Sequence, residues 1–171
     1  MIDLLDHPVS ETDLADLTAL LVDAVDGGAS VSFLPPLASE RAAAWWRKTI
    51  DGLDPRGVVL VARDADGIVG SVQLQPAWAP NQPHHAEVAK LLVHRRARRR
   101  GLGRALMLEL ERRAAAGGFT LLTLDTKRGD AAEALYRTTG WTEAGVIPGY
   151  AVDADGTLCD TVYFYRTLDG K

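Results

Sequence analysis

Residues 94–104, HRRARRRGLGR, combine clustered arginines with two closely spaced glycines. Five arginines fall within residues 95–100, and Gly101 and Gly103 follow at the start of an apolar, helix-forming stretch. The first amides of a helix lack acceptors within the helix and lie at the positive end of its dipole, so phosphate binds well there. Glycine permits close approach to the backbone, and arginine adds bidentate hydrogen bonds. The pattern therefore predicts a pyrophosphate-binding loop.

Other uses of this charge fit less well. A Walker loop needs Gly-Lys-Ser/Thr, which the sequence lacks, and a dinucleotide fingerprint needs Gly or Ala where Leu106 stands. Without the five arginines, the chain has 14 basic residues against 23 acidic ones. Positive charge is thus concentrated in one place, whereas a nucleic-acid binder usually spreads it over a whole face. The charge pattern alone is also compatible with a short basic targeting signal.

The loop must be positioned by regular elements, which the apolar spacing locates. It predicts helices over residues 11–25, 40–50, 102–116 and 131–139, and strands over residues 57–63, 68–75, 86–93, 119–125, 141–147 and 161–167. Helix ends are expected at a capping box from Ser10 to Asp13, at a cap on Ser39, and at the glycines 27–28, 117–118 and 140.

The order of these elements indicates a topology. The strands 57–63 and 68–75 flank a turn at Asp66-Gly67 and form a hairpin. Residues 86–125 form a strand–helix–strand unit, which makes its two strands parallel. The sequence therefore predicts an α/β (α+β) fold with a mixed sheet, and its length suits a single domain over residues 1–171.

The motif Arg98-x-x-Gly101-x-Gly103, placed between a strand and a helix, resembles the acetyl-CoA loop of the GCN5-related N-acetyltransferase (GNAT) family. Residues 132–136 (AEALY) and Gly140-Trp141 extend the resemblance. It implies a mostly antiparallel central sheet, a parallel core that binds acetyl-CoA as cosubstrate, and flanking helices. The residues implied to bind acetyl-CoA are Leu91, Leu92, Val93, Arg98, Arg99, Arg100, Gly101, Leu102, Gly103 and Arg104.

One position departs from the family. Gly129 stands where many members have an asparagine that contacts the pantetheine arm. A narrower resemblance, to the tabtoxin-resistance acetyltransferases, rests on segments 27–31, 86–91, 125–126, 147–150 and 163–164. It implies a small, polar amine as acceptor, and hence toxin or antibiotic detoxification. The acceptor-site wall implied by it comprises Gly28, Ala29, Ser30 and Phe33.

Acetyl transfer to an amine needs a base, a stabilised oxyanion and a protonated leaving thiolate. A free amine has a pKa of about 10, so it binds mostly as ammonium and a general base is expected. Glu87 is the first candidate for this base; the alternative is an exposed carboxylate at a strand end without a catalytic role. Asp125 is a candidate for a second base or for binding the substrate ammonium; the alternative is a carboxylate that caps a loop. Tyr136 is the candidate acid, or else a core tyrosine. The family implies that a backbone N–H near Leu92 or Val93 holds the oxyanion.

The bulk composition sets the remaining expectations. Apolar residues make up 47% of the chain, no apolar run reaches membrane-spanning length, and the acidic start shows no signal-peptide pattern. The single Cys159 excludes an internal disulfide, and adjacent His84 and His85 lack a third ligand, so no metal is expected. We expect a cytoplasmic monomer or homodimer that acts on a small-molecule amine, without nucleic acid or membrane partners. Protein N-terminal or lysine acetylation and non-catalytic acyl-CoA sensing stay as alternatives.

Overall fold

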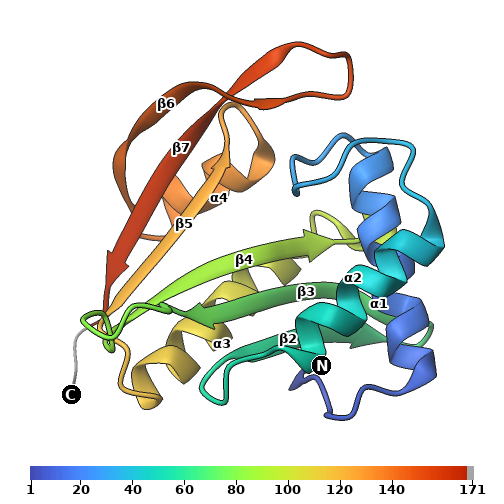
Figure 1. The fold of residues 1–171 in the computed structure, drawn as a ribbon, viewed down its shortest axis with the longest axis horizontal. Coiled ribbons are helices and arrows are strands. Elements are labelled where there is room, and N and C mark those ends of the chain that lie inside the picture. Colours follow the sequence, from blue (N-terminus) through green and yellow to red (C-terminus); the bar gives the residue numbers. More distant parts are fainter. Residues whose placement is uncertain (169–171) are drawn as a thin grey trace.

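A seven-stranded sheet forms the centre of the computed structural model, which describes residues 1–168 (Figure 1). Its strands are β1 (Ile2–Leu4), β2 (Val58–Asp64), β3 (Gly67–Pro76), β4 (His85–Val93), β5 (Leu121–Lys127), β6 (Thr142–Val152) and β7 (Leu158–Thr167), in the spatial order β1-β2-β3-β4-β5-β7-β6. Within the described residues, only β4 and β5 pair in parallel. The predicted mixed, mostly antiparallel sheet is therefore confirmed.

Helices cover both faces of this sheet. They are α1 (Glu11–Asp26), α2 (Ser39–Asp51), α3 (Leu102–Ala116) and α4 (Ala131–Thr138), with a short 3₁₀ helix at Arg95–Ala97. In Figure 1, α1 and α2 lie in front of the sheet and α3 lies behind it. Each side has its own apolar core: Trp46 is fully buried in the first and donates to the Leu17 carbonyl at 2.9 Å, and Leu106 is fully buried in the second. Across residues 1–168, no helix has the length and apolar character that crossing a bilayer requires.

The predicted helix ends are partly right. Ser10 Oγ accepts a hydrogen bond from the Asp13 amide at 3.0 Å, but the Asp13 carboxylate pairs with Arg63 at 2.6 Å instead of completing a capping box. The cap predicted at Ser39 is wrong, because Ser39 is the first helical residue and Ala38 precedes it without a side-chain cap. The predicted glycine ends are confirmed at Gly27 and, for α3, at 117.

Several strands differ from the prediction. The strand β1 was not predicted, since three residues are too few for an alternating pattern. Both β6 and β7 are longer than expected, because pairing continues past Pro148 and Gly149 through a register shift between Ile147 and Ala151. A search for strict alternation of apolar and polar residues does not detect the part of a strand that follows such a bulge.

The parallel pair β4–β5 is short, and this creates the space for a site. Pairing joins only three positions, His85 with Leu121 through Glu87 with Thr123. Beyond Glu87 the strands diverge, and Figure 1 shows them side by side at one end and apart at the other. Within residues 1–168, the edge of β4 that faces β5 thus has no ladder partner beyond this point.

Candidate active site

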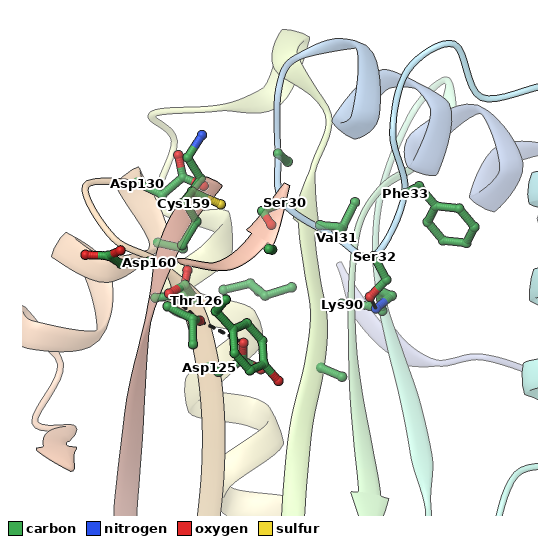
Figure 2. A pocket seen from close by; sticks show the side chains of 18 of the residues that line it. Ser30, Val31, Ser32, Phe33, Lys90, Asp125, Thr126, Asp130, Cys159 and Asp160 are labelled. Carbon is green, nitrogen blue, oxygen red and sulfur yellow. Dashed lines mark hydrogen bonds between the residues drawn. The ribbon is translucent and has the colours of Figure 1, made fainter. Parts of the chain in front are cut away.

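Two adjoining cavities lie where β4 and β5 diverge. We call the first the carboxylate cavity, because Glu87 and Asp125 line it; its volume is about 470 Å³, and its other walls are residues 29–34, α4 and the β6–β7 hairpin (Figure 2). The second, the glycine-loop groove, has a volume of about 580 Å³ between the start of α3, the end of β4 and α4. Four residues line both: Ala29, Leu91, Asp130 and Ala132. Both volumes fall within the range of small-molecule sites.

The glycine-loop groove has the backbone expected of an anion site. Gly101 precedes α3 with a φ of +76° and Arg99 has a φ of +60°, so the chain turns sharply and presents the first helical amides without a side-chain cap. A Cβ atom on Gly103 would lie 3.4 Å from Leu135 Cδ2 and 3.9 Å from Val93 Cγ2. A single Cβ would thus make ordinary van der Waals contacts, whereas a larger side chain would take up space in the groove between α3 and α4.

Two of the five clustered arginines support the fold. Arg95 forms an ion pair with Asp23, whose side chain is only 9% exposed, and its amide donates to the same carboxylate at 2.9 Å. Arg96 pairs with Asp64 at 2.7 Å and with Asp66 at 3.2 Å. These two side chains tie the loop to α1 and to the β2–β3 turn, so their charge is already matched.

The other arginines are divided by position. Arg98 and Arg99 line the glycine-loop groove, as does Arg104 from the first turn of α3. Among the described residues, Arg100 does not line it, and its predicted role in ligand binding stays a prediction. The concentration of positive charge in the sequence is therefore only partly available to a ligand.

The carboxylate cavity places two acids on neighbouring strands. Asp125 Oδ2 accepts a hydrogen bond from Thr161 Oγ1 at 2.9 Å, and Asp125 pairs with Tyr163 in the β5–β7 register. Burial raises the pKa of Glu87, and the nearby Asp125 charge raises it further, while Lys90 opposes both effects. A raised pKa brings a carboxylate closer to the value that suits a general base at neutral pH. The two charges also favour a cationic ligand.

Tyr136 serves both the core and the cavity. Its ring packs against Trp141 and Phe164 at centroid distances of 5.9 and 5.8 Å, and only 5% of the residue is exposed. It also lines the carboxylate cavity, and within residues 1–168 its hydroxyl has no hydrogen-bond partner. Burial, followed by the Asp125 charge, raises the pKa of this phenol, so it stays protonated at neutral pH. It is thus able to donate a proton.

The predicted acceptor wall is mostly where it was expected. Ala29, Ser30 and Phe33 line the carboxylate cavity, whereas Gly28 lies in the turn after α1 with a φ of +80° and is not among the lining residues. Sequence reasoning assigned no individual role to several other lining residues: Ser32, Leu34, Lys90, Asp130, Tyr150, Cys159 and Asp160. Their signal is weak, because most of them belong to loops and to a hairpin whose position only the folded chain defines, and Lys90 lies at an irregular point of β4.

Comparison with known proteins decides the family. The sequence profile of the Acetyltransferase (GNAT) family matches residues 27–141. The chain belongs to this family. It is therefore an acyltransferase, and the matched range includes Glu87, Asp125, Tyr136 and the whole glycine loop.

Individual relatives agree with this assignment. An uncharacterized N-acetyltransferase of Azospirillum brasilense, from the hisH-hisA intergenic region, is 33% identical over 117 residues, which cover 67% of this acetyltransferase and 68% of the relative. The ribosomal-protein-alanine N-acetyltransferase of Brucella melitensis superposes with a TM-score of 0.78 at 26% identity, over 98% and 99% of the two chains. A phosphinothricin acetyltransferase of Sinorhizobium meliloti, solved in complex with acetyl-CoA, has a TM-score of 0.80 at 23% identity, over 98% and 88%.

Proposed function

We propose that this enzyme transfers an acetyl group from acetyl-CoA directly to the amine of a small, polar acceptor. One observation carries the proposal: the cavity lined by Glu87 and Asp125 lies next to a groove that presents helix-terminal amides and arginines. The first suits an ammonium group and the second suits a pyrophosphate. The acetyl-CoA bound by the Sinorhizobium meliloti relative supports the choice of cosubstrate.

The groove residues fit acetyl-CoA chemically. In the proposal, amides from Arg99 to Arg104 and the guanidinium groups of Arg98, Arg99 and Arg104 hold the phosphates. The apolar side chains of Leu91 and Leu135 line the same groove and suit the pantetheine arm. The acyl thioester then lies next to the carboxylate cavity, because the two cavities share lining residues.

The proposed reaction assigns one step to each of three side chains. Asp125 holds the acceptor ammonium, and Glu87 takes its proton, directly or through water, so that the nitrogen lone pair attacks the thioester carbon. An amide of β4 near Leu92 or Val93 stabilises the negative oxygen. As the C–S bond breaks, Tyr136 gives its proton to the departing thiolate, and the second proton of the attacking nitrogen returns through water to the tyrosinate, which restores the phenol. No covalent enzyme intermediate is needed, so Cys159 takes no part in the transfer.

An acceptor screen tests this function. Purified enzyme is incubated with acetyl-CoA and a panel of amines, and release of the free thiol is followed by a colorimetric reagent. We expect turnover with small polar amines and at least a 100-fold lower rate for Glu87→Gln, in line with the range of about 10²–10⁴-fold for general base catalysis. Binding of acetyl-CoA without turnover on a broad panel would instead support a non-catalytic sensor.

A second candidate is acetylation of a protein N-terminus. It is favoured by the ribosomal-protein-alanine N-acetyltransferase of Brucella melitensis, the relative at 26% identity. Peptides that begin with alanine, compared with free amines of the same size, separate the two functions. A specificity constant that is higher for the peptides would replace the small-molecule proposal.

The narrower proposal is detoxification of an amine-bearing toxin or antibiotic. Its support is the segment resemblance to tabtoxin-resistance acetyltransferases, together with the phosphinothricin acetyltransferase among the solved relatives. Acetylation of phosphinothricin and of tabtoxin-derived amines, measured by mass spectrometry, tests it. Turnover on other small amines with none on these would leave the general function and remove the detoxification role.

A further inference from the structure

A bulge in β4 changes the direction of Lys90. Ala89 pairs with Gln73 on β3, but the next pair joins Leu92 with Ser71, so two residues of β4 stand opposite one residue of β3. Lys90 takes up the irregularity with a φ of +52°. Positive φ is uncommon for a residue with a side chain, and an observed outlier of this kind is a reason to look for function.

The bulge matters because side chains alternate along a strand. Val88 packs into the core beneath α3, and regular alternation would send residue 90 into the same apolar core. Instead, Lys90 Nζ donates to Ser32 Oγ at 3.3 Å and lies 5.3 Å from the centre of the Trp45 ring. Both partners lie on the opposite side of the sheet, which is also the side of Glu87. The irregular backbone thus brings a cation into the carboxylate cavity.

Within residues 1–168, this ammonium has no carboxylate in direct contact. Among residues 1–168 it forms no ion pair, and its single hydrogen bond, to Ser32, uses one of three donors. Burial lowers the pKa of Lys90, while the charges of Asp125 and Glu87 act in the opposite direction. In Figure 2, Lys90 and Ser32 lie on one side of the cavity and Asp125 on the other. The cavity is therefore bipolar, with a positive end and a negative end.

We propose that Lys90 binds an anionic group of the acceptor, so that the acceptor class is an amine that also carries a carboxylate. This inference rests on the proposed function, because it concerns the same cavity. The ammonium of the acceptor lies toward Glu87 and Asp125, and its carboxylate lies toward Lys90 and Ser32. Two opposite charges fix the orientation of a small molecule more firmly than one, and they select against neutral amines of the same size.

The test compares acids with their amides. Each standard L-amino acid is assayed beside its C-terminal amide, which keeps the amine and removes the negative charge, and a set of neutral alkylamines is added. The specificity constant is measured for the wild type, Lys90→Met and Lys90→Arg. We expect Lys90→Met to lower the acid-to-amide ratio by roughly 10–100-fold, the range for a hydrogen bond to a charged group, and Lys90→Arg to retain most of the preference.

The ratio separates recognition from other roles. Intrinsic differences in amine reactivity cancel when the wild type and the variant are compared, and Lys48→Met, on the exposed surface of α2, controls for loss of a surface charge. Equal losses on acids and amides would overturn the inference, since a structural or proton-transfer role affects both. Turnover of neutral amines without any preference for acids would overturn it and leave the proposed function standing. No turnover in any set would overturn the proposed function and the inference with it.

Discussion

Replacing Tyr136 with phenylalanine separates proton donation from core packing. The ring is held between Trp141 and Phe164, and phenylalanine keeps those contacts. The hydroxyl faces the carboxylate cavity and bonds to no other residue within 1–168, so its removal breaks no hydrogen bond inside the protein and should change the free energy of unfolding by less than about 1 kcal/mol. For a chain of this length, that is at most a few degrees, roughly 2–4 °C, in melting temperature.

Activity should respond very differently. If the phenol protonates the departing thiolate, its loss should lower kcat and kcat/KM together, by roughly 10²–10⁴-fold, when C–S cleavage limits the rate. An aryl thioester donor, whose thiolate leaves without a proton, should restore most of the lost rate. Steady-state thiol release and thermal unfolding measure the two effects on the same samples.

Tyr165→Phe is the matched control, because Tyr165 lies on β7 with 36% of its surface exposed and does not line either cavity. It should change neither rate nor stability. Full activity of Tyr136→Phe under chemistry-limited conditions would refute the reasoning and leave water as the proton donor. A large fall in melting temperature with normal turnover would assign Tyr136 to the core alone.

Three further predictions concern the base, the groove and the arginines. Burial and Asp125 raise the pKa of Glu87, so the wild-type enzyme should begin to lose rate at a pH higher than that at which an ordinary carboxylate is protonated. Glu87→Gln should remove this acidic decline of the pH–rate profile and should regain rate at high pH; an unchanged profile contradicts the prediction. Gly103→Val should abolish acetyl-CoA binding in calorimetry while the protein stays folded, whereas Gly103→Ala should be milder. Arg95→Ala should cost about 1–3 kcal/mol in urea unfolding without changing acetyl-CoA affinity, and Arg98→Ala should do the reverse; equal effects would mean the arginines do not differ in role.

The sequence was most informative where function depends on local backbone. Gly101 and Gly103 indicated the groove because a helix N-terminus is set by neighbouring residues, and the structure has Gly101 at a φ of +76°, a conformation that glycine allows. Glu87 and Asp125 could be placed together because a strand–helix–strand unit makes their strands neighbours, and Tyr136 was added by the family resemblance of residues 132–136. All three line one cavity.

The sequence was least informative where pairing between distant segments decides the outcome. The bulge at Lys90 depends on the register between β3 and β4, and alternation alone would bury that side chain. The separate partners of Arg95 and Arg96 depend on how α1 and the β2–β3 turn meet the loop. A run of identical arginines in the sequence does not indicate which of them form ion pairs within the fold and which line the groove.

The divergence of β4 and β5 also constrains the order of events in catalysis. The two cavities touch through four shared residues but are otherwise separately lined, so filling one does not require emptying the other. In the direct transfer that we propose, both substrates are present at once, and the amine meets the thioester within a ternary complex. Initial-rate plots at several fixed acceptor concentrations should accordingly intersect rather than run parallel, as they would if the enzyme carried the acetyl group alone. The gap between β4 and β5 thus leads to a kinetic prediction, namely that two ligands bind side by side and that no acetylated enzyme forms between the two half-reactions.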